Sequence, residues 1–281
     1  MAKHYEALQR AEAERRRKVS GTPPPVAPTD WDTTPSTVRS GKSGLVKRII
    51  GALKRNARAG SETSNEINKR RISILQPESF AAEQFRTLRG RIDSLATQQP
   101  ITTVALVSAN SDEGKSTAAI NLAAVTSMSV GRKVLLVDCD LRQPKIHKSL
   151  GVEPSIGLGE VLSGNAQLED AIVRADSVEL DVLPVRTRPG NPSELLASAA
   201  MRQLLDRAGE LYDQVILDTP ACLGLPDAKT ISELCDGIVL VVRAGATPRQ
   251  DVEAVLEVLD QRRVLGLLLN GAELGPSPSG Y

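Results

Sequence analysis

A Gly-Lys-Ser-Thr sequence at residues 114–117 follows a short apolar segment, Val104–Val107, and a polar loop. An Ala-rich stretch, residues 118–130, comes next. Strand, tight loop, Gly-Lys-Ser/Thr and helix in this order predict a loop that binds nucleotide phosphates through backbone N–H groups and a helix N-terminus. In such a loop Lys115 reaches the β- and γ-phosphates, and Ser116 offers its hydroxyl to Mg²⁺. We therefore expect the ATP-binding loop to comprise Ala109, Asn110, Ser111, Asp112, Glu113, Gly114, Lys115, Ser116 and Thr117.

The match departs from the motif at one position, because Ala109 stands where the motif has its first glycine, five residues before Gly114. A polar strand-to-helix turn with a helix cap is therefore the alternative interpretation of this stretch. A second Gly-Lys-Ser, residues 41–43, has Ser36 at the first-glycine position and no strand before it. We interpret that second sequence as linker.

Carboxylates follow two further apolar segments. Asp138 and Asp140 come directly after residues 133–137, and Asp218 comes directly after residues 213–217. The carboxyl ends of parallel strands are where ligands bind in open α/β folds. Beside Lys115, the first pair could hold a metal, order its water and take a proton from a hydroxyl, whereas Asp218 would serve Mg²⁺. The alternative is that these are charged loops at strand ends.

These side chains need elements that bring the strand ends together. We expect strands at residues 104–107, 133–137, 178–185, 213–217, 237–243 and 265–270. Helices are expected at 78–98, 118–130, 191–211, capped by Asn191 or Ser193, and 248–262, with short helical pieces at 156–164 and 168–174. This alternation predicts an α/β fold, a P-loop NTPase-type, mostly parallel sheet with helices on both faces. Only 2% of the residues are aromatic, so the core must be aliphatic.

Composition favours a cytoplasmic protein. No apolar run of the 281 residues reaches the roughly 18 that span a membrane, and the start, MAKHYEALQR, lacks the apolar core of a signal peptide. Cys139, Cys222 and Cys235 show no CxxC spacing, so we expect reduced thiols. With only two histidines, a zinc site is not expected.

The first 71 residues read as a basic tail and linker. Residues 1–60 carry 13 Lys or Arg and 5 Asp or Glu, although the whole chain has a net charge of only +1. An anionic partner is thus expected for the tail alone, and no nucleic acid. Residues 45–58 form a basic amphipathic pattern. A helix of this kind can lie on anionic lipid, where each basic residue contributes about 1 kcal/mol to binding near the surface. The other interpretation is a solvated tail that docks on its own domain.

Three charged residues, Glu83, Arg86 and Arg89, recur along one side of the helix expected at 78–98. Such a row is ordinarily a solvated face with one ion pair worth a few tenths of a kcal/mol. An interface between subunits is the second interpretation.

Three motifs together resemble one family. ANSDEGKST, VLLVDCDLRQP and VILDTP, in that order, resemble the Walker A, A′ and B motifs of the bacterial tyrosine kinases (BY-kinases) of capsule and exopolysaccharide synthesis. EQFRTLR, GLGEVLSG, PGNPSELLAS and VRAGAT agree with that family. The resemblance covers residues 72–271, and the DxDLRxP spacing is its most specific part.

The resemblance implies a P-loop kinase domain, residues 72–275, that transfers the γ-phosphoryl group of ATP to tyrosines of its own tail, here residues 276–281. It implies that Lys115, Ser116 and Thr117 bind phosphates and Mg²⁺, and that Asp138 and Asp140 serve metal and catalysis. Asp218 would bind the metal through water. We also place Arg142 and Asn270 in the nucleotide site.

The family also implies partners. The row of Glu83, Arg86 and Arg89 matches its ExxRxxR pattern, which packs one subunit against the next in a ring, so we expect a homo-oligomer. The kinase is often separate from a membrane-spanning chain-length or co-polymerase activator. Such a partner would hold the chain at the inner face of the cell membrane, with peripheral contact through the basic tail.

The sequence departs from the family at three places. Ser111 and Asp112 replace a Pro-Gly pair, and a carboxylate about 7 Å from a phosphate charge costs roughly 2 kcal/mol at an effective dielectric of 20. Ala221 replaces a proline after Asp218-Thr219. Tyr281 stands alone where the family has a tyrosine cluster, and we expect it to be the phosphoacceptor.

Two other functions remain open at this point. A partitioning or division-site ATPase shares the fold, but it carries a signature lysine where this chain has Ser108-Ala109-Asn110. A regulatory subunit that binds nucleotide without catalysis is the other alternative, favoured by Asp112 and the single tail tyrosine. Phosphate released into water, phosphate transferred to protein, or neither would separate the three.

Overall fold

The structure is a computed structural model that describes residues 71–176 and 178–272, all within one unit of the chain, Lys54–Tyr281. The basic tail, its amphipathic segment 45–58, the linker sequence 41–43 and Tyr281 lie outside the described residues, so their interpretations stay predictions. Over the part of the chain that is described, none of the helices has the length and apolar character needed to cross a membrane.

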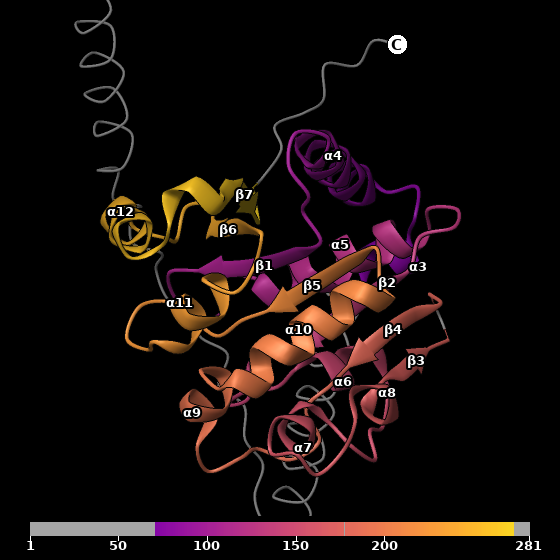
Figure 1. The fold of residues 1–281 in the computed structure, drawn as a ribbon. Helices are drawn as coiled ribbons and strands as arrows, with labels where there is room; N and C mark the ends of the chain where they lie inside the picture. The colour runs from indigo at the N-terminus through magenta and orange to yellow at the C-terminus, as the bar shows by residue number, and fades with distance from the viewer. Residues whose placement is uncertain (1–70, 177, 273–281) are drawn as a thin grey trace, which may run out of the picture. The chain divides into compact units, whose positions relative to one another are not determined.

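A seven-stranded sheet forms the centre of the domain, in the order β3-β4-β2-β5-β1-β6-β7 (Figure 1). Its strands are β1 Thr103–Ser108, β2 Val134–Asp138, β3 Val173–Ala175, β4 Leu180–Leu183, β5 Gln214–Asp218, β6 Gly237–Arg243 and β7 Val264–Asn270. Every neighbouring pair is parallel except β3 with β4. The predicted mostly parallel α/β fold is confirmed.

Helices cover both faces of this sheet. They are α3 Ile72–Leu75, α4 Phe80–Ala96, α5 Lys115–Ser127, α6 Ile146–Leu150, α7 Leu158–Leu162, α8 Leu168–Ala171, α9 Pro192–Leu196, α10 Ala199–Leu211, α11 Asp227–Ser232 and α12 Arg249–Val258, with a 3₁₀ turn at Gln261–Arg263. The first four pack on one face and the remaining six on the other, so α4 and α10 lie on opposite sides (Figure 1). Because β1, β2 and β5 are covered on both faces, every one of their residues is buried.

Three local predictions were wrong. Residues 168–174 are not helical throughout, because Val173–Ala175 leaves the helix and pairs antiparallel with β4 at the sheet edge. Residues 191–211 form two helices, and α10 starts anew where the Ser198 hydroxyl accepts the Met201 N–H. Neither Asn191 nor Ser193 caps α9 through its side chain, since the Ser193 hydroxyl is bonded elsewhere.

Candidate nucleotide-binding and phosphoryl-transfer site

A cavity of about 820 Å³ opens where the carboxyl ends of the strands meet α3, α4 and α5. The charged side chains that line it are Asp112, Lys115, Asp140, Arg142, Lys145 and Arg243. The four basic side chains outnumber the two acidic ones, which suits a polyanionic ligand. The remaining polar lining comes mostly from the loop between β1 and α5, where the sequence placed its phosphate-binding motif.

Gly114 has to be glycine for two reasons. Its φ of 97° lies in the left-handed region, and a Cβ there would lie 1.9 Å from Nδ2 of Asn270. That amide donates to the Glu113 carbonyl at 2.9 Å, so the end of β7 holds the loop where it turns into α5. Ala109, in contrast, packs its methyl group into the core and needs no glycine. The departure at Ala109 therefore leaves the loop intact.

Glu113 braces this loop from within. Its buried carboxylate accepts the Asn110 N–H at 3.1 Å and the Thr247 hydroxyl at 2.6 Å. The Asn110 side chain in turn donates to Asp251 of α12 at 2.8 Å. These bonds tie the loop to the segment between β6 and α12, so the Glu113 and Asn110 side chains support the shape of the loop.

Lys115 lies folded into the loop with only 7% of its surface exposed. Its ammonium donates to the Ser108 hydroxyl at 2.8 Å. Burial lowers the pKa of Lys115, while the negative charges of Asp218 and Asp140 act in the opposite direction. The ammonium is thus already at the base of the cavity and needs a side-chain rotation to reach a phosphate.

Asp138 is fully buried and anchors the segment that follows β2. Its Oδ1 accepts the Asp140 N–H at 3.2 Å, and its Oδ2 accepts the N–H groups of Lys145 and Ile146, both at 3.1 Å. Burial, with the Asp218 charge second, raises the pKa of Asp138 well above its usual range. Both of its oxygens therefore accept backbone N–H groups, and these bonds fix the path of the loop between β2 and α6.

Asp218 is paired in register with Asp138 on the neighbouring strand and is equally buried. Within the described residues neither of its oxygens has a hydrogen-bond partner of normal geometry. Burial raises the pKa of Asp218 to about 6, although the Ser116 hydroxyl and the Lys115 charge act to lower it. A buried carboxylate left unpaired beside Ser116 is the kind of group that a divalent cation completes.

Of the three carboxylates at or just after the ends of β2 and β5, Asp138, Asp140 and Asp218, it is Asp140 that lines the cavity. Its Oδ1 accepts the Gln143 N–H at 2.9 Å, which turns the side chain toward the mouth of the loop. No three acidic, His or Cys side chains of the described ranges gather closely enough to cage an ion alone. That suits Mg²⁺, which keeps several waters and takes one or two carboxylates together with phosphate oxygens.

Arg142 is held by Asp227, which the sequence did not single out, and by Ser193, which was expected to cap a helix. Its Nε donates to Asp227 at 2.8 Å and a terminal nitrogen donates to Ser193 at 2.8 Å, while the Ser193 hydroxyl donates to Asp227 at 2.6 Å. The hydrogen bond to buried Asp227 raises the pKa of Arg142. Ser193 lies in the quoted stretch PGNPSELLAS, but no spacing links Asp227 to Arg142.

The mouth of the cavity carries an ion pair that the sequence did not predict. The Lys145 ammonium lies 3.1 Å from Oδ1 of Asp112, which belongs to the loop between β1 and α5. Lys145 lines the cavity, and its backbone N–H donates to the Asp138 carboxylate.

The row on α4 makes contacts inside the chain. Arg86 pairs with Glu83 and donates to the Pro77 carbonyl at 2.7 Å. Arg89 donates to the Val125 carbonyl and the Ser129 hydroxyl, both at 2.7 Å, at the C-terminal end of α5. In this subunit Arg89 therefore caps the helix that starts at the phosphate loop, and the interface interpretation stays a prediction.

The fold and the site define a P-loop nucleotide-binding domain of the AAA type. A family model described as an AAA domain matches residues 101–263. The chain is 38% identical to the tyrosine-protein kinase YwqD of Bacillus subtilis over 213 residues, which is 75% of this chain and 90% of YwqD. It is 34% identical to the succinoglycan biosynthesis transport protein ExoP of Rhizobium meliloti over 83% of this chain but only 30% of ExoP.

The kinase domain of the Escherichia coli tyrosine kinase ETK has the same fold. It superposes with a TM-score of 0.70 at 32% identity, over 75% of this chain and 84% of that domain. The chain belongs to the family of bacterial tyrosine-protein kinases, as the three sequence motifs implied.

Proposed function

We propose that this chain is an ATP-dependent protein-tyrosine kinase that phosphorylates its own tail, with Tyr281 as the acceptor. The observation that carries the proposal is the buried, unpaired Asp218 beside Lys115 and Ser116, with Asp140 facing the cavity. A site that only bound a phosphate would not need an uncompensated carboxylate, whose burial is costly. A site that transfers a phosphoryl group needs charges arranged for a metal and for an attacking hydroxyl.

The residues divide the work by position. The N–H groups of residues 111–117 bind the phosphates, and Lys115 binds the group that is transferred. Ser116 and Asp218 would hold Mg²⁺, with Asp138 and Asp140 ordering its water; the metal would neutralise charge that develops on the phosphates. Asp140 reaches the cavity, so it is placed to accept the proton of the tyrosine hydroxyl, whereas Asp138 is occupied with backbone.

Among the described tyrosines, Tyr212 is unsuited as the acceptor. Its hydroxyl donates to Asp181 at 3.0 Å and its half-buried ring packs against the core. Burial and the Asp181 charge raise its pKa. Tyr212 is therefore packed in the fold, and Tyr281 remains our proposed acceptor.

The proposed setting is exopolysaccharide or capsule production. ExoP is named for succinoglycan biosynthesis transport, and the part it shares with this chain is less than a third of its length. We propose that a membrane-spanning co-polymerase protein is the activator of this chain. It would hold a homo-oligomer at the inner face of the membrane, with the basic tail in contact with anionic lipid.

Incubation with ATP and Mg²⁺ followed by phosphosite mapping tests the proposal. Phosphate on Tyr281 is the expected result, and it should disappear when Tyr281 is deleted. Phosphate released only into water would instead favour a partitioning-type ATPase, although Ser108-Ala109-Asn110 lacks the lysine of that class. Bound nucleotide without either product would favour a regulatory subunit.

Separate Asp138→Asn and Asp140→Asn variants sharpen the test. Both should lower transfer, and at least one should raise the Mg²⁺ concentration needed for half-maximal rate, because both carboxylates would order the water of the metal. If both variants turn over like the parent, the two carboxylates have no part in the reaction.

A further inference from the structure

Asp112 occupies a backbone conformation that glycine normally supplies. Its φ is 61°, in the left-handed region, which Asp and Asn tolerate better than other side chains. Its carbonyl accepts an N–H of Arg243 at 3.1 Å, so the residue is held from the end of β6. Its carboxylate points across the loop mouth to Lys145 at 3.1 Å. The replacement therefore keeps the shape of the loop and adds one negative charge at its rim.

Lys145 is attached beside the catalytic carboxylates. Its backbone N–H donates to Asp138 Oδ2, which fixes where the side chain starts. Its side chain is one-third exposed and lines the same cavity as Lys115 and Asp140. Its positive charge is close enough to lower the pKa of both Lys115 and Asp218. The ammonium is thus within the electrostatic field of the cavity that Lys115 and Asp140 also line.

The pair between these residues is weak enough to exchange. Asp112 is 77% exposed, and ion pairs at exposed sites are largely screened by water and salt. A triphosphate carries several negative charges and offers oxygens to an ammonium from within the cavity, where screening is lower. A rotation of the Lys145 side chain, without backbone movement, takes the ammonium from one anion to the other.

We propose that Lys145 is a second phosphate-binding cation of this site, and that Asp112 holds its ammonium at the rim until nucleotide enters. Asp112 acts as a stand-in for phosphate in the empty site. Nucleotide then binds more weakly than it would to the same loop with an uncharged residue at 112, because it must displace a carboxylate from Lys145. This inference rests on the proposed function only in requiring that the cavity binds ATP.

The test is a double-mutant cycle on ATP binding, measured by titration calorimetry with Mg²⁺ and ATP on the full chain. The variants are Asp112→Asn, which tolerates the left-handed backbone and removes the charge, Lys145→Met, and the double variant. Lys148→Met is the matched control, because Lys148 is an exposed lysine three residues away that does not line the cavity. Thermal melting of each variant checks that it is folded.

Asp112→Asn should bind ATP about 3- to 10-fold more tightly than the parent, since two opposing charges no longer have to be separated. Lys145→Met should bind ATP about 5- to 20-fold more weakly, with a smaller loss for ADP, because the lost contact is to the terminal phosphate. Lys148→Met should match the parent.

The sign of the coupling separates this proposal from a simpler one. If Lys145 moves to the phosphate, Asp112→Asn helps more in the parent than in Lys145→Met, because only the parent has a pair to break. If Lys145 instead stays on Asp112 and merely neutralises it, Asp112→Asn helps more in the Lys145→Met background, where the carboxylate would repel the phosphates unmasked. Equal effects, or the second pattern, overturn the proposal.

Kinase activity distinguishes the two levels of failure. A parent that binds ATP and labels Tyr281, with no coupling between positions 112 and 145, overturns this inference alone. A parent that binds no ATP overturns both this inference and the proposed function.

Discussion

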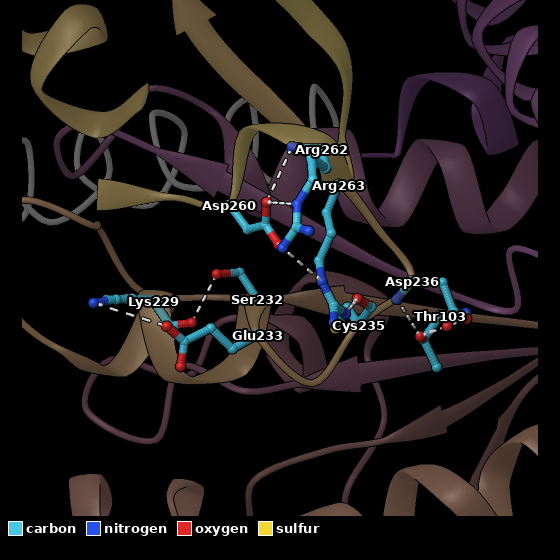
Figure 2. Close-up of polar contacts among 9 residues, drawn as sticks. All are labelled: Thr103, Lys229, Ser232, Glu233, Cys235, Asp236, Asp260, Arg262 and Arg263. Atoms are coloured by element: carbon cyan, nitrogen blue, oxygen red, sulfur yellow. Dashed lines mark hydrogen bonds and ion pairs between the residues drawn. The ribbon is translucent and has the colours of Figure 1, made fainter. Parts of the chain in front are cut away.

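Carboxylates at the two ends of the parallel strands differ in their hydrogen bonding. We call the side of the sheet where the strands begin the amino edge, and the side where they end the carboxyl edge. At the amino edge, Asp236 precedes β6 and its Oδ2 accepts the Thr102 N–H at 2.9 Å and both the N–H and hydroxyl of Thr103 at 2.8 Å. Figure 2 shows Asp236 and Thr103 together with Arg263, which donates to the Cys235 carbonyl. In the same region Asp260 pairs with Arg262 at 2.8 Å, and hydrogen bonds from Arg262 lower the pKa of Asp260 to about 2.

At the carboxyl edge Asp138 accepts three backbone N–H groups, but its neighbour Asp218 is left short of partners among the described residues. Asp218 is buried without a hydrogen bond of normal geometry, and burial raises the pKa of Asp138 above its usual range. Asp112 occupies a left-handed backbone conformation at the rim. The amino edge thus stabilises the fold, while the carboxyl edge holds in Asp218 a buried carboxylate that a ligand would satisfy, a division expected where stability is given up for function.

Lys115→Ala should break the carboxyl edge as a site and leave the amino edge untouched. Transfer to Tyr281 should fall by at least about 100-fold, because the ammonium contacts the group in transfer. The domain should stay folded, because the ammonium contacts the Ser108 hydroxyl and not the apolar core, and urea unfolding checks this. Labelling that persists in a folded Lys115→Ala protein would remove Lys115 from the mechanism.

Asp236→Ala should do the reverse. Three donors around Thr103 lose one acceptor, so the free energy of unfolding should fall by about 3 kcal/mol. Urea unfolding measures this loss. Below the transition the variant should still bind ATP with the affinity of the parent. A variant as stable as the parent would show that the amino edge is not the stabilising one.

Asp218→Asn should sharpen the comparison through pH. Folding raises the pKa of the Asp218 carboxyl to about 6. Such a group stabilises the fold at pH values below the pKa it has in the unfolded chain, and that contribution is lost as the pH rises through 6. The metal-free parent should therefore be less stable than Asp218→Asn by about 3 kcal/mol at pH 8. Near pH 4 the two should be nearly equal.

Urea unfolding of both proteins across this pH range, in the presence of a chelator, checks the sign. A difference that does not change with pH would mean that Asp218 is not held protonated by burial.

Arg89→Ala should give the smallest effect. α5 runs from the phosphate loop to the amino edge, where Arg89 donates a hydrogen bond to the Val125 carbonyl. Loss of this bond should lower the free energy of unfolding by about 1 kcal/mol. Light scattering at matched concentration tests the interface prediction on the same variant. Arg86→Ala is the control for the stability effect, because its bonds stay within the start of α4 and the turn before it. Since Arg86 belongs to the same predicted row, the interface prediction expects both variants to shift toward monomer. A shift to monomer in Arg89→Ala alone would mean that one side chain both caps α5 and joins subunits.

The sequence predicted the features that depend on local order along the chain. Six of the strands, and the carboxylates that end two of them, follow from apolar segments closing on Asp138 and Asp218. The three-residue strand at 173–175 is too short to leave such a pattern. The clamps on Arg142 and Lys145 could not be predicted, because their partners lie 85 and 33 residues away and meet them only through the crossing of loops.

The same reason hid the role of Arg89. Its spacing with Glu83 and Arg86 indicated a surface row, but its partners on α5 lie 36 and 40 residues further along the chain. Helical periodicity gives the direction in which a side chain points and not what lies there. A residue's contact across the fold is set by the packing of α4 on α5, which the sequence leaves open.

The central place of β1 sets an order for synthesis. Although it is the first strand of the described chain, both its neighbours, β5 and β6, are made more than 100 residues later, and the Thr219 hydroxyl reaches back 113 residues to the Leu106 carbonyl. Asn270 closes the loop at Glu113 from 157 residues downstream. A chain still on the ribosome without its last strand therefore has no finished phosphate loop. We therefore expect the loop to be complete only once the whole sheet has emerged, just before the tail that we propose as the substrate.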